Sequence, residues 1–244
     1  MLAINDHVIL ILVALAQPIL GYRSFHRLLR LAAAGRMVKL GHLYNRTIIG
    51  QWLLFALLLI TWYSNDRPWA ALGFTLRWDW QAAAGAALAI AALLTLIVRL
   101  RRLAGTDEET REALLARLGH VEIILPRTAA QLRHFYAVSI TAGIVEESIW
   151  RGFMLWYLGH FMPLWAAVVL SSLSFGLAHI YQGVANVPKS AVIGFVFATI
   201  YVLTGSLLIP ILLHALADAL QGRAVFRLLC AATGPGPARA PAPR

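Results

Sequence analysis

Three apolar stretches of the chain carry acidic, basic and imidazole side chains of the kinds used in catalysis. Carboxylates and imidazoles move protons in hydrolytic reactions, and both also bind metal ions. One stretch contains two adjacent glutamates and an arginine, and each of the other two contains a histidine. The residues concerned are Glu146, Glu147, Arg151, His179, His214 and Asp218, and Phe175 lies one helical turn before His179.

The two glutamates are predicted to have different tasks. A charge in the middle of a membrane span costs about 2.5–3.5 kcal/mol on insertion scales, so these groups must face the interior of a helix bundle, a water-filled cavity or one another. Glu147 and Arg151 are four residues apart and can pair on one helix face, which a purely structural ion pair would also do. Glu146 points about 100° away from Glu147 and has no cation at that spacing. It is therefore free to act as a general base.

The two histidines have structural as well as catalytic interpretations. His179 could be satisfied by a carbonyl at a helix end, and His214 could simply bond to Asp218 one turn later. Counted at 1.5 Å per residue, Glu146 lies about 17 Å from the start of its span and His179 about 24 Å from the start of the next. These depths allow the polar groups to meet inside a hydrocarbon core of about 30 Å.

The elements that position these residues are predicted to be transmembrane helices. Of the 244 residues, 60% are hydrophobic and only 13% are charged, which is about half the usual charged share of a soluble domain. Backbone groups in a bilayer must be satisfied internally, which favours helices. We therefore expect an all-α polytopic protein with about seven transmembrane helices, six to eight being compatible with the pattern. The apolar stretches are residues 7–22, 47–63, 81–99, 135–158, 163–180, 189–204 and 206–222, the last two divided at Gly205.

The basic residues are distributed asymmetrically between the predicted loops. The formal net charge is +10, with 21 lysines and arginines. With seven spans, all of these lie on one side except Arg67, Arg77 and the intramembrane Arg151. Such a bias predicts a multi-pass protein of the plasma membrane with a cytoplasmic C-terminus. No basic face remains for nucleic acid once the loops are assigned.

The chain is predicted to divide into three regions. Residues 1–130 contain the N-terminal spans and a cytoplasmic amphipathic helix over 105–125, which Thr106 would cap. Residues 131–225 form the catalytic helical core. Residues 226–244 form a disordered tail rich in proline and alanine.

The motifs together resemble those of a known family. Residues 146–151 have the form EExxxR, residues 175–179 the form FxxxH, and residues 214–218 the form HxxxN/D. In this order, on three polar-bearing spans, they resemble the CPBP family, which includes CAAX prenyl endopeptidases, bacteriocin-processing and self-immunity proteins, and Abi proteins. The resemblance covers roughly residues 138–222.

This resemblance implies an intramembrane endopeptidase that cleaves a protein or peptide at the bilayer, including lipid-modified ones. It implies that Glu146 is the general base and that His179 shares or orients the proton. His214 and Asp218 would hold the oxyanion. One departure is Asp218, because many relatives have asparagine there and an ionised aspartate only accepts hydrogen bonds. It could instead fix the tautomer of His214. The supporting residues would be Glu147, Arg151 and Phe175.

Three alternatives use the same residues. Glu146, His179, His214 and Asp218 form a nitrogen and oxygen set suited to zinc. The chain has no HExxH motif, and we expect a mechanism without metal or other cofactor. The second alternative is a non-catalytic immunity or binding protein on the same scaffold. The third is an ion transporter, which would be expected to show repeated halves that the sequence lacks.

Overall fold

The computed structural model describes residues 2–232, and all regular structure within them is helical. Two π-helical segments, Leu12–Ala16 and Ser148–Met154, join α1 to α2 and α6 to α7 without a break. The first half of the chain contains α1 (Ile4–Ile11), α2 (Gln17–Ala33), α3 (Leu40–Ser64), α4 (Trp80–Ala104) and α5 (Glu108–Leu118). The second half contains α6 (Ala129–Glu147), α7 (Leu155–Leu158), α8 (Leu164–Ala178), α9 (Val187–Thr204) and α10 (Leu208–Ala232).

The helices confirm the prediction of an all-α polytopic membrane protein. Each of the seven predicted stretches lies largely within one continuous helix. Within the described residues, five helical segments are long and apolar enough to cross a membrane, and α8 is a shorter apolar helix. The five segments are Ile4–Ala33, Leu40–Ser64, Trp80–Leu103, Val184–Thr204 and Leu208–Ala231. The remaining helix, α6 to α7, carries the charged motif.

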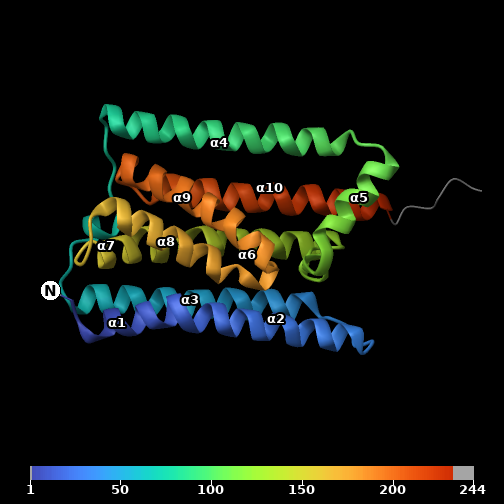
Figure 1. Ribbon diagram of the computed structural model, residues 1–244, viewed down its shortest axis with the longest axis horizontal. Helices are drawn as coiled ribbons and strands as arrows, with labels where there is room; N and C mark the ends of the chain where they lie inside the picture. Colours follow the sequence, from blue (N-terminus) through green and yellow to red (C-terminus); the bar gives the residue numbers. More distant parts are fainter. Residues whose placement is uncertain (1, 233–244) are drawn as a thin grey trace, which may run out of the picture.

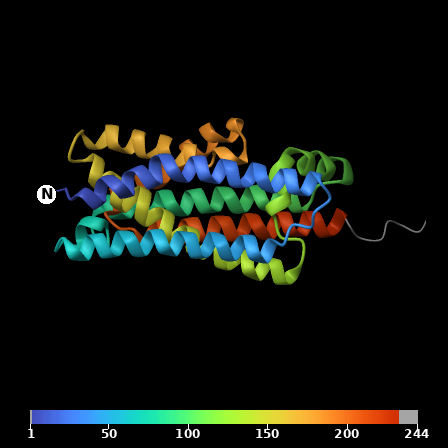
Figure 2. The ribbon, with the colours of Figure 1, turned by 90° about the horizontal axis from the view of Figure 1, so that it is seen from below.

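The long helices run side by side along the longest axis of the molecule (Figures 1 and 2). In Figure 1, α4 lies at one side, α1, α2 and α3 lie at the other, and the helices of the second half lie between them. The most extensive contacts join α6 to α10 and α8 to α9. Glycines allow both approaches: a Cβ atom at Gly143 would lie 2.8 Å from the Ile211 carbonyl oxygen, and one at Gly176 would lie 2.7 Å from that of Val187.

The division between the last two helices falls at Gly205, as predicted. Gly205 has a φ of +63°, which favours glycine, and its N–H donates to the Tyr201 carbonyl at 2.8 Å. The connection between α3 and α4, which contains Arg67 and Arg77, lies at the end of the bundle near the N-terminus (Figure 1). The connections on either side of α5 lie at the opposite end (Figure 1). The α3–α4 connection and the connections beside α5 are thus at opposite ends of the bundle.

Two predicted boundaries are wrong. Helix α10 continues to Ala232, so residues 226–232 are helical rather than part of a disordered tail; they contain good helix formers, and the proline-rich sequence begins only after them. The rest of the predicted tail, residues 233–244, lies outside the described residues. The helix predicted over 105–125 is capped by Asp107, whose carboxylate accepts from the Thr110 N–H at 2.8 Å, and it stops at Gly119, where φ is +52°. A 3₁₀ segment, Gly119–Ile124, follows.

Candidate active site

The predicted pair of Glu147 and Arg151 forms the buried centre of the site. Arg151 Nη1 donates to Glu147 Oε1 at 3.0 Å, and the two side chains are 1% and 0% exposed. Arg151 also reaches α9, where Nη2 donates to the Gly194 carbonyl at 3.2 Å. Its guanidinium carbon lies 4.5 Å from the centre of the Phe175 ring on α8. The arginine therefore joins α6, α8 and α9.

The second half of the EExxxR motif adopts a π-helix rather than an α-helix. The segment Ser148–Met154 is completely buried. The wider turn of a π-helix changes which backbone groups are paired inside the helix. The Trp150 carbonyl within it accepts a hydrogen bond from Ser171 Oγ on α8 at 2.8 Å. This bond anchors the irregular segment, and with it Arg151, against the neighbouring helix.

His214 bonds to Glu147 rather than to Asp218. His214 Nδ1 lies 2.7 Å from Glu147 Oε1, whereas Nε2 lies 3.6 Å from Asp218 Oδ2, which is too long for a hydrogen bond. An ionised carboxylate only accepts, so Nδ1 donates. Glu147, and not Asp218, thus fixes which His214 nitrogen carries hydrogen, which corrects the partner expected from local spacing.

Glu146 faces His179 on α8. Glu146 Oε2 and His179 Nε2 are 4.0 Å apart, and the side chains are 12% and 19% exposed. The other ring nitrogen, Nδ1, lies 2.8 Å from the Phe175 carbonyl oxygen and donates to it. That carbonyl lies in the last turn of α8, where carbonyl groups have no partner further along the helix. In the neutral ring, Nε2 therefore presents its lone pair toward Glu146.

Gln51 on α3 also contacts Glu146, which the sequence motifs did not reveal. Gln51 Nε2 donates to Glu146 Oε1 at 2.8 Å. Gln51 precedes the three motifs by many residues. The signal that could have indicated it is a single amide in the otherwise apolar run of residues 48–60.

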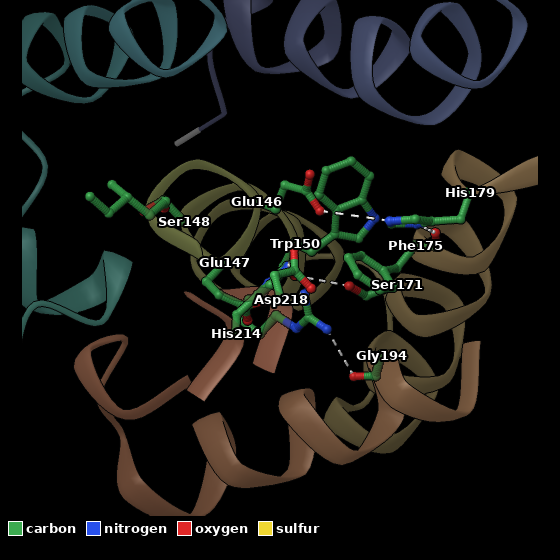
Figure 3. A network of polar contacts seen from close by, with 12 residues as sticks. Glu146, Glu147, Ser148, Trp150, Ser171, Phe175, His179, Gly194, His214 and Asp218 are labelled. Atoms are coloured by element: carbon green, nitrogen blue, oxygen red, sulfur yellow. Dashed lines mark hydrogen bonds and ion pairs between the residues drawn. The ribbon is translucent and has the colours of Figure 1, made fainter. Parts of the chain in front are cut away.

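The polar groups line one cavity of about 1070 Å³. Figure 3 shows Glu146 and His179 facing each other, with Glu147 beside His214. Asp218 is the most open of the acidic groups, with a side chain 38% exposed. At the loop after α8, burial raises the pKa of Tyr181 to about 12, so its hydroxyl stays protonated. The predicted residues that line this cavity are Glu146, Glu147, Phe175, His179, His214 and Asp218.

The structure does not group the four residues that the sequence suggested as zinc ligands closely enough to bind one metal ion. Across residues 2–232, no three histidine, cysteine, aspartate or glutamate side chains are grouped so that they could hold a metal ion. The short contact of His214 is to Glu147, which was not a member of that set, and the contact of His179 with Glu146 is 4.0 Å long.

Comparison with protein-family models identifies the part of the chain that contains these residues. Residues 128–220 match the model described as type II CAAX prenyl endopeptidase Rce1-like. No curated protein matches the chain, and no solved structure matches it. The matched segment begins at the N-cap of α6 and ends within α10, so it contains all three motifs and excludes α1 to α5. The family suggests an intramembrane protease. Residues 128–220 thus form an Rce1-like domain of the type II CAAX prenyl endopeptidase (CPBP) family.

Proposed function

We propose that the protein is an intramembrane endopeptidase in which Glu146 and His179 activate a water molecule to hydrolyse a peptide bond. The observation that carries this proposal is the pairing of two hydrogen-bond acceptors across the cavity. Glu146 Oε2 and the lone pair of His179 Nε2 face each other at 4.0 Å. Neither can donate to the other in these protonation states.

A water molecule between these acceptors would be well placed to react. It would donate one hydrogen to Glu146 and one to His179, with its oxygen about 2.8 Å from each. A lone pair on the water oxygen would attack the substrate carbonyl carbon as Glu146 removes a proton. The new C–O bond forms, the C–N bond breaks, and the proton passes to the leaving amine.

His214 is the proposed donor to the oxyanion. Its Nδ1 is bound by Glu147, which leaves Nε2 directed into the cavity on the side of Asp218. With hydrogen on both nitrogens, His214 would donate from Nε2 to the developing negative charge. Asp218 as a carboxylate cannot donate, so we assign it to the charge and orientation of His214. Glu147, Arg151 and Phe175 would hold His214 and α8 in place.

The proposed substrate is a protein or peptide located at the membrane. The name of the matched family refers to prenylated substrates, and the cavity size does not by itself select for a prenyl group. A library of membrane-associated peptides, each synthesised with and without a prenyl chain, distinguishes these substrates. Specific cleavage of the prenylated members alone would establish the narrower class.

The test of the proposed function is cleavage of that library by the purified full chain in lipid nanodiscs. Wild type is expected to cut at least one peptide at a single bond, identified by mass spectrometry. The double variant Glu146→Gln/His179→Gln keeps similar side-chain size but replaces the carboxylate and the imidazole by amides, which cannot take a proton from the water, so it should cut none. Binding of peptides without cleavage by wild type would favour the immunity or binding-protein alternative. Equal cleavage by the double variant would refute the proposed mechanism.

A further inference from the structure

Gln51 lies outside the Rce1-like domain but donates a hydrogen bond to the Glu146 carboxylate inside it. We infer that Gln51 is a positioning residue that orients Glu146 for its reaction with water. This inference rests on the proposed function, because it assigns Gln51 a task within the same reaction. It extends the active site to α3, a helix that the family match does not include.

The hydrogen bond of Gln51 assigns separate tasks to the two oxygens of Glu146. Oε1 accepts from Gln51 Nε2 at 2.8 Å, and Oε2 faces His179 at 4.0 Å. The terminal torsion of a glutamate is broad and poorly restricted by its own geometry. Among the described residues, Gln51 makes the hydrogen bond that restricts it. Without this bond, rotation of the carboxylate would move Oε2 away from the attacking position.

The neighbouring residue fixes the distance between α3 and α6. Trp52, which follows Gln51 in the sequence, donates from Nε1 to Thr141 Oγ1 at 3.2 Å. Thr141 lies about one and a half helical turns before Glu146 on α6. The Thr141 side chain is buried. This bond holds the backbone of α3 near Gln51 against α6, so the Gln51 amide has a fixed position relative to Glu146.

An amide is a suitable donor for this task. It orients the carboxylate without contributing a positive charge, whereas the nearby guanidinium of Arg151 pairs with Glu147 instead. A neutral donor therefore leaves Glu146 more basic than a cation in the same place would. Because Gln51 holds the base and not the substrate, its loss should lower kcat and leave KM nearly unchanged.

The experiment replaces Gln51 by methionine, which has similar length but no N–H donor. Kinetics are measured on the full chain with the library peptide that wild type cleaves fastest. A hydrogen bond to a charged group is lost, so kcat should fall by about 10–100-fold while KM stays within about twofold. The matched control is Gln81→Met on α4, because Gln81 is also half-buried but does not line the cavity, and its amide oxygen accepts from Arg77 Nη2 at 3.0 Å. This variant should keep the wild-type kcat.

The outcomes separate this inference from the proposed function. If Glu146→Gln is inactive but Gln51→Met keeps the wild-type kcat, the role of Gln51 is refuted and the role of Glu146 stands. If Glu146→Gln is fully active, the proposed function itself fails. Should Gln51→Met melt well below wild type, the kinetics are repeated below its transition, where the variant is folded. A wild-type kcat there overturns the inference, and the expected loss of kcat at a nearly unchanged KM supports it.

Discussion

Replacing Arg151 by alanine should destabilise the fold more than any change to a surface ion pair. Arg151 is 1% exposed and is bound to Glu147, to the Gly194 carbonyl and to the face of the Phe175 ring. Its removal leaves the Glu147 carboxylate, which is completely buried, without its cation. Glu147 Oε2 already has no hydrogen-bond partner among the described residues, so the bond from His214 to Glu147 Oε1 is the contact that remains to offset the loss.

The expected loss follows from the burial of the pair. Removing one partner of a buried ion pair costs about 3–5 kcal/mol, because the other charge remains desolvated. At about 2–4 °C of melting temperature per kcal/mol for a chain of this size, the transition should fall by roughly 6–20 °C. The bond from His214 Nδ1 to Glu147 provides a partial replacement, which places the expected shift in the lower half of that range.

The assay is thermal unfolding of the purified full chain in one detergent, together with peptide cleavage below the transition. The matched control is Arg127→Ala, since the Arg127–Glu122 pair is 50% and 34% exposed and should contribute only about 0.2–1 kcal/mol. The double variant Glu147→Gln/Arg151→Met removes both charges and keeps an acceptor for His214. It should recover part of the loss. An inactive Arg151→Ala with a normal melting temperature would refute the structural assignment and place Arg151 in the chemistry.

Two further predictions concern orientation and metal. A reporter fused after Arg244 should read as cytoplasmic, because the basic residues lie predominantly on that side; an external signal would contradict the predicted orientation. Treatment with 1,10-phenanthroline should leave proteolysis intact, and metal analysis of active protein should find well below about one equivalent. Activity that is lost on removal of stoichiometric zinc and regained on its return would establish the zinc alternative.

Local spacing was sufficient to predict the parts of the structure that depend on one helix. The seven apolar stretches were recognisable from composition, and the pairing of Glu147 with Arg151 follows from their separation by four residues. Gly205 could be recognised as a helix boundary because glycine readily adopts a positive φ. The motifs on three helices indicated that their side chains could meet, and residues from all three motifs line one cavity.

Contacts between helices could not be predicted from the spacing of residues within one helix. The His214–Asp218 spacing suggested a bond within one helix, but the close approach of α10 to α6 at Gly143 brings Glu147 to 2.7 Å from His214. Gln51 belongs to no motif, and only the packing of α3 on α6 shows that it reaches Glu146. No residue of the π-helical segment Ser148–Met154 indicated in advance that its hydrogen bonding would differ from that of the flanking α-helix.

The central claim is that Glu146 takes part in the reaction, whereas the adjacent Glu147 stabilises the structure. A direct comparison of Glu146→Gln with Glu147→Gln tests this claim. Both changes keep side-chain shape and remove one charge. Glu146→Gln should lower kcat by about 10²–10⁴-fold, the usual contribution of a general base, with a nearly unchanged melting temperature. Glu147→Gln leaves Arg151 as a buried unpaired cation, so it should lower the melting temperature. A fully active Glu146→Gln, or a Glu147→Gln that is as stable as wild type but inactive, would contradict the account.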